Sequence, residues 1–162
     1  MALRSDRNHV ADDISFFATS VAERGGIVSV VTTGSGAAMD QSVQVAGYVA
    51  NPSGVKPLGV LMNDVVNLDL TRQHSNWHKD EVQVNSKVTI WTVGTVVTNW
   101  IMPGQTPTAG QVAYVGHSGY FSNSNVANDA VDSTGATRKV GRFLSIKDED
   151  GYAKIAVNLP NG

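Results

Sequence analysis

The most constraining feature of the sequence is a two-residue alternation of apolar and polar side chains that recurs along most of the chain. It is clear in "VQVAGYVA" (43–50) and again in "KVTIWTVGTVVTNWI" (87–101). Successive side chains of a strand point to opposite faces, so this pattern indicates strands with one buried face. Turn-forming residues interrupt it roughly every 8 to 12 residues, which gives about ten short strands. The sequence therefore predicts an all-β fold, a compact β-barrel or β-sandwich, over alternating strands and helices.

The expected strands cover residues 27–33, 43–50, 57–62, 65–70, 81–84, 87–101, 111–115, 119–123, 139–146 and 152–159. Short turn-forming connections predict three hairpins, which pair 81–84 with 87–101, 111–115 with 119–123, and 139–146 with 152–159. The stretch 87–101 is longer than the usual upper limit of about 10 residues for a strand. Gly94 in its middle therefore predicts a bulge or bend. Residues 123–138 are polar and predict the longest loop.

The N-terminal part of the chain has a different pattern. Residues 1–11 have little periodicity and are expected to form an extended arm ahead of a single domain, residues 12–162. Within "DDISFFATSVAERGG" (12–26), apolar residues fall at helical spacing, and Asp and Gly residues stand where a helix would begin and end. The sequence therefore predicts one short helix here, with Ile14, Phe17, Val21 and Ala22 on its apolar face.

Composition excludes several classes of function. The formal net charge is −2 and charged residues make up only 16% of the chain, against about a quarter in typical domains. The basic residues are scattered, so neither nucleic acid nor an anionic membrane is an expected partner. The absence of cysteine excludes disulfides and thiolate chemistry. The N-terminus has no apolar signal region and no run could span a bilayer, so we expect a soluble protein made without export.

His74 and His78, in "TRQHSNWHKDEVQ" (71–83), are the first candidates for a metal site. The zinc signature H-E-x-x-H requires Glu after the first histidine, but residue 75 is serine. Both rings would need a helix to meet at one metal, and on a strand they would lie about 13 Å apart. We therefore expect a loop here and not a metal site.

Other motifs are incomplete in the same way. "KDEDGYAK" (147–154) lacks the spacing and the final acidic residue of a calcium loop, so Asp148 and Asp150 are expected to serve a turn leading to Gly151. "GHSG" (116–119) lacks the strand-to-helix context of a serine nucleophile. The sequence therefore predicts no enzyme activity and no cofactor.

Five blocks together resemble head decoration (cement) proteins of tailed bacteriophages. They are "RGGIVSVVTTGSGAAMD", "PLGVLMNDV", "NWHKDEVQVNSKVTIWTVGTVVTNWI", "PTAGQVAYVGHSGYFSN" and "VGRFLSIKDEDGYAKIAV", and the likeness runs from about Asp12 to Val157. The resemblance implies a small β-rich protein, commonly a homotrimer, on the outer surface of the expanded capsid. Its implied partners are the major capsid protein and further copies of itself, with no cofactor and no catalysis. It also implies an N-terminal arm that reaches over capsid subunits.

Two segments are candidate capsid or subunit contacts. Arg and Phe suit a partly buried interface, so the N-terminal segment offers Arg4, Arg7, Phe16 and Phe17. For the two Phe residues, ordinary core packing is the alternative. The second candidate is the 71–81 loop with His74, Trp77 and His78, in which Trp77 could equally pack inside its own chain.

Two other functions stay open from the sequence. One is a receptor- or glycan-binding β module of a phage tail or fibre, which would use exposed aromatic platforms such as Trp77 and Tyr120. The other is a metal-dependent enzyme that uses the histidine pair. Location on the tail would favour the first, and bound metal would favour the second.

Overall fold

The computed structural model describes residues 3–4, 9–18, 20–32, 45–67, 81–125 and 138–159, and the side chains of 3–4, 9–15 and 32 lie outside that description. The fold is nearly all β, with its strands in a barrel-like sheet, as the alternation predicts. The strands are β1 (Leu3–Arg4), β2 (His9–Ala18), β3 (Ile27–Thr32), β4 (Val45–Gly47), β5 (Pro57–Leu61), β6 (Asp64–Val66), β7 (Glu81–Gln83), β8 (Ser86–Thr98), β9 (Val112–Val115), β10 (Phe121–Ser122), β11 (Lys139–Phe143) and β12 (Ala153–Asn158). One 3-10 turn, η1 (His117–Gly119), joins β9 to β10.

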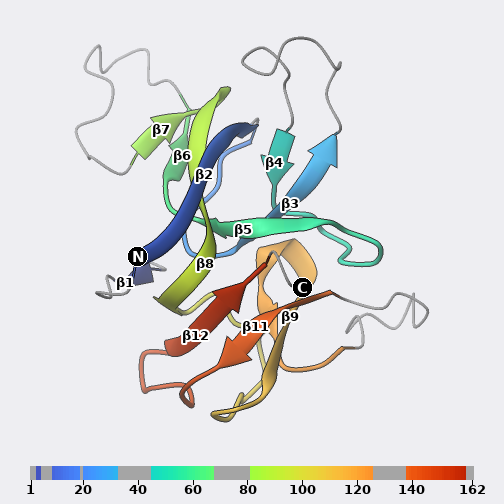
Figure 1. Ribbon diagram of the computed structural model, residues 1–162, viewed down its shortest axis with the longest axis vertical. Helices are drawn as coiled ribbons and strands as arrows, with labels where there is room; N and C mark the ends of the chain where they lie inside the picture. Colours follow the sequence, from blue (N-terminus) through green and yellow to red (C-terminus); the bar gives the residue numbers. More distant parts are fainter. Residues whose placement is uncertain are drawn as a thin grey trace.

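Strand β8 organises the sheet because its two halves have different neighbours. Its first half pairs with β2 on one edge and with β5 on the other, and the order β8-β2-β4-β3-β5 returns to β8. Its second half pairs with β12, from which the sheet continues through β11 and β9 to β10. Figure 1 shows β8 running from the group of β2 to β5 to the group of β9, β11 and β12. The molecule is thus a small closed barrel and an open antiparallel sheet that share one long strand.

The hydrophobic core follows this division. One cluster lies in the barrel and receives Val88 and Ile90 from β8, and a second cluster includes Val96 together with side chains of β9 to β12. Burial along β8 keeps the two-residue period that strands impose. A single amphipathic strand therefore supplies both clusters.

The expected irregularity at Gly94 is confirmed. Gly94 pairs with His9 on β2, but its neighbour Val93 pairs with Ala11, so Val10 is left over as a bulge opposite the glycine. Gly94 has φ of 156°, a value that side-chain-bearing residues rarely adopt. The bend lies where β8 passes from the barrel to the open sheet.

The prediction of a short helix over 12–26 is wrong, because residues 9–18 form strand β2. The ladder between β2 and β8 shifts register at three places, between His9 and Ala11, between Ala11 and Asp12, and between Asp13 and Phe16. Each bulge adds one residue to the strand, so the apolar residues no longer recur at every second position. Their spacing then resembles the three- to four-residue spacing of a helix. The arm expected over 1–11 is strand-paired where it is described, since Leu3 and Arg4 lie opposite Thr98 and Val97 of β8.

Two of the three expected hairpins are confirmed. β9 pairs with β10, and β11 pairs with β12, both antiparallel. The prediction of a hairpin between 81–84 and 87–101 is wrong, because β7 pairs in parallel with β6. The turn at Asn85 is present with φ of 69°, but its N–H donates to the carbonyl of Ala18, 2.7 Å away. The chain therefore turns out of β7 toward β2 instead of folding back on itself. The loop expected at 123–138 falls mainly on residues 126–137, outside the described part.

Candidate functional site

The structure describes only part of the expected contact set. Arg4 lies in β1 with its backbone paired to β8, but its side chain is not described. Arg7, His74, Trp77 and His78 lie outside the described residues. The expected 71–81 contact loop and the histidine pair therefore have no structural account.

Phe16 and Phe17, at the end of β2, are both half-buried and take part in packing. Phe16 packs against the barrel cluster, as the alternative interpretation of core packing has it. The Nζ atom of Lys87 lies 5.7 Å from the centroid of the Phe17 ring, within the range of a cation–π contact. Both rings thus already have neighbours within the chain, although part of each remains at the surface.

Three aromatic rings from distant parts of the chain form a cluster, which the sequence did not reveal. Trp100 contacts both Tyr48 and Tyr120, with ring centroids 5.0 and 4.7 Å away and the ring planes tilted by 46° and 45°. The Tyr48 hydroxyl donates to the carbonyl of Glu23 and accepts from the N–H of Gly26, 3.1 Å away. Burial is the main cause that raises the pKa of the Tyr48 phenol well above its ordinary value. Tyr120 contacts Trp100 and is half-buried, so it is a poor open platform for a glycan.

No group of three or more His, Asp and Glu side chains within the described ranges is placed to hold a metal ion. In the "GHSG" segment, the His117 Nδ1 atom is in contact with the carbonyl of Ala50. Ser118 has φ of 50° in η1, between strands and not before a helix. The segment thus lacks the geometry of a nucleophile elbow. In the described part of the chain, no helix is long and apolar enough to cross a membrane.

The connection between β11 and β12 is an ordered hairpin with an acidic tip. As expected, Asp148 serves a turn: its carbonyl accepts from the N–H of Gly151 at 3.0 Å and its Oδ1 atom accepts from the N–H of Tyr152 at 2.7 Å. Gly151 has φ of 85°, which favours glycine. Two apolar side chains before the turn are exposed, Leu144 by 44% and Ile146 by 65%. The hairpin therefore presents both apolar and acidic side chains to solvent.

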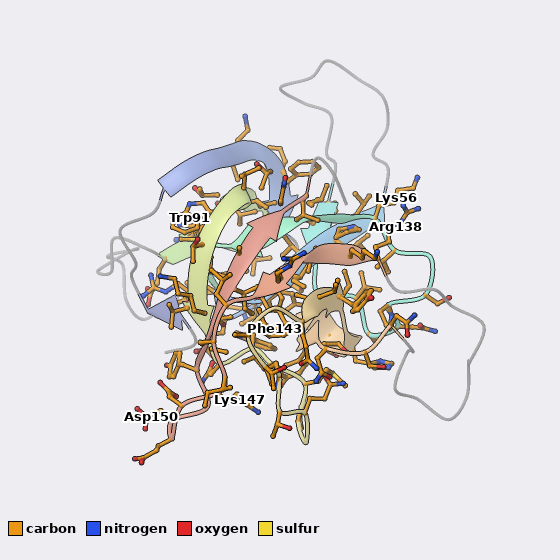
Figure 2. All side chains as sticks on the ribbon, turned by 60° about the horizontal axis from the view of Figure 1, so that its bottom comes forward. Lys56, Trp91, Arg138, Phe143, Lys147 and Asp150 are labelled. Atoms are coloured by element: carbon orange, nitrogen blue, oxygen red, sulfur yellow. The ribbon has the colours of Figure 1, made fainter. Side chains whose placement is uncertain are left out.

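A cleft of about 290 Å³ lies at another part of the surface, lined among the described residues by Lys56, Pro57, Arg138 and Leu159. Lys56 precedes β5, Arg138 precedes β11, and Leu159 follows β12, so three strand ends form it. Lys56 and Arg138 are exposed, and Figure 2 shows them side by side at one end of the molecule. No short-range pattern in the sequence joins these two cations, so only the fold reveals the cleft.

Comparisons with known proteins add no identification. Neither the protein-family models nor the curated proteins searched include a match to the chain.

Proposed function

We propose that the chain is a structural virion protein that binds the outer surface of an expanded bacteriophage capsid and cements neighbouring major capsid subunits. The observation that supports this most is the ordered resemblance to decoration proteins. Its blocks coincide with elements that build the fold: the turn into β3, then β5 and β6, then β7 and β8, then β9 to β10, and the β11–β12 hairpin. The resemblance therefore extends over β3 and over β5 to β12, and not over one motif.

The physical role follows from linked contacts. A decoration subunit buries surface on two or more capsid subunits, and association between copies multiplies modest affinities into avidity. Binding to the expanded shell and not to other forms stabilises that shell by mass action. The cement would thereby resist the internal pressure of packaged DNA.

The N-terminal segment is the proposed capsid grip, with Arg4 and Arg7 as its charged contacts. Its attachment to β8 supports the choice, because β1 and β2 pair with the same edge of that strand and tie the segment to the folded domain. Removing residues 1–11 would also remove the first residues of β2, so a cut before His9 is the cleaner truncation. That protein keeps β2 and loses β1.

The test is co-sedimentation with empty expanded capsids of the phage that encodes the chain. Truncation before His9 and the double substitution Arg4→Glu/Arg7→Glu are each expected to weaken binding at least about tenfold, as loss of interface anchors does. Arg142→Glu is the matched control, because Arg142 is an exposed arginine of β11 away from the segment. If both N-terminal variants bind capsids as well as the original chain, the N-terminal segment is not the capsid contact. Labelled protein found on tails and absent from heads would instead favour the receptor-binding module.

A further inference from the structure

The cleft at Lys56 and Arg138 has the composition of a site for a carboxylate beside an apolar group. Its two cations share the lining with Pro57 and Leu159. A guanidinium binds a carboxylate through two parallel N–H donors, and an ammonium adds a point charge. Lys139, next to Arg138, is exposed as well and adds to the positive charge at this end of β11.

The β11–β12 hairpin carries the complementary set. Glu149 stands at the exposed tip between Asp148 and Asp150, and Ile146 is exposed by 65% at its base. Lys147, which precedes the three acidic residues, donates from its Nζ atom to the carbonyl of Gln105, 3.2 Å away. The tip is therefore acidic with an apolar neighbour, which matches the cleft in both respects.

The hairpin is also held in shape before any partner binds. Besides the Asp148 turn, the Ser145 hydroxyl accepts from the N–H of Lys154 at 2.8 Å, and the N–H of Leu144 donates to the carbonyl of Lys154 at 2.7 Å. A pre-ordered element loses little conformational entropy on binding.

Within one chain the hairpin and the cleft cannot meet. Figure 2 shows Asp150 and Lys147 far from Lys56 and Arg138. We infer that the hairpin tip of one copy docks into the Lys56–Arg138 cleft of a second copy, with Glu149 toward Arg138 and Ile146 against the apolar lining. The inference rests on the self-association in the proposed function and names the surfaces through which copies join. Because two different surfaces meet, the contact is head-to-tail and closes into a ring when the rotation allows.

A charge-swap series tests this contact in solution without any capsid. Light scattering and sedimentation velocity on the full chain give the dissociation constant of self-association. Arg138→Glu and Glu149→Lys are each expected to raise that constant at least about tenfold, because each places like charges together. The double variant Arg138→Glu/Glu149→Lys restores the charge pairing with its polarity reversed, and is expected to return to within about threefold of the original chain.

Two further variants distinguish a specific docking contact from a general effect of charge on self-association. Ile146→Ser is expected to weaken association with no change of charge, and Arg142→Glu, which changes the charge as Arg138→Glu does, is expected to leave it unaltered. Circular dichroism confirms that each variant is folded. A chain that stays monomeric at high concentration, or a double variant that is weaker than both single variants, would overturn the inference. A monomer that still co-sediments with expanded capsids would leave the proposed function intact, so the two failures are distinguishable.

Discussion

At the residue scale, Thr98 is a buried polar residue whose hydrogen bonds join two separate parts of the chain. Its side chain is fully buried at the end of β8, where Oγ1 donates to the carbonyl of Gly25 at 2.9 Å and accepts from the N–H of Trp100 at 3.1 Å. It thus ties the turn before β3 to the exit from β8. Thr98→Val keeps the shape but leaves both backbone groups unpaired, which typically costs about 1–3 kcal/mol.

We therefore expect Thr98→Val to lower the free energy of unfolding in urea by about 1–3 kcal/mol. Thr95→Val is the control, since Thr95 is a half-buried threonine of the same strand. An equal effect of the two substitutions would mean that the buried hydrogen bonds of Thr98 contribute nothing particular.

Tyr48 makes stability depend on alkaline pH. Burial raises the pKa of its phenol in the folded state above the ordinary value of 10.0. Above about pH 10 the unfolded chain releases this proton and the folded chain keeps it, so the free energy of unfolding falls as the pH rises. Below that pH both states are protonated and this contribution to stability is complete.

Tyr48→Phe is expected to make the alkaline fall of the unfolding free energy shallower than in the original chain. It also removes the hydrogen bonds to Glu23 and Gly26, so stability at neutral pH decreases. Chemical unfolding of both proteins between pH 8 and pH 11.5, approximately the range that brackets phenol titration, measures both effects. Parallel pH profiles would show that Tyr48 titrates as it does in the unfolded chain.

At the element scale, the sequence predicts the regular strands well. β3, β5, β9, β11 and β12 lie within or close to the expected ranges. β9 and β12 alternate buried with less buried residues, and β3 and β5 are short apolar runs between turn residues. It fails at β2, whose bulges disturb the period, and at β7, which pairs with β6 instead of its neighbour in the chain. Local patterns fix where a strand lies, but long-range packing chooses its partner.

The candidate surfaces were harder to predict than the strands. Asp148, as a turn residue, follows from local composition. The Lys56–Arg138 cleft and the Tyr48–Trp100–Tyr120 cluster join residues that are distant in sequence, and no local spacing announces such contacts. Of the N-terminal candidates, Phe16 packs against the barrel cluster but stays partly exposed, so its place in a capsid contact remains a prediction.

Strand β8 should make unfolding cooperative, because it supplies both core clusters. Val88 is buried in the barrel cluster and Val96 in the other. Val88→Ala and Val96→Ala are each expected to cost roughly 0.5–3 kcal/mol and to shift one common transition. Far-UV circular dichroism and the fluorescence of Trp91 and Trp100 check this, because coincident curves indicate two-state unfolding. Two separated transitions in either variant would show that the barrel and the open sheet fold independently.

At the scale of the whole molecule, the acidic hairpin tip and the Lys56–Arg138 cleft lie far apart (Figure 2). Two separate surfaces of this kind suit copies arranged head to tail around a symmetry axis. Salt should weaken such a contact, since the Debye length falls from about 10 Å at 0.1 M to about 3 Å at 1 M. The N-terminal segment on β8 is left to face a second partner, the capsid in the proposed function.

The most direct test of the cement role is the binding of the full chain to expanded and unexpanded capsids of its phage, compared by co-sedimentation at equal subunit concentration. The proposed function predicts saturable binding to the expanded shell, little binding to the unexpanded one, and a higher disruption temperature for the decorated expanded particle. Equal binding to both shells, or decoration without any rise in that temperature, would contradict it.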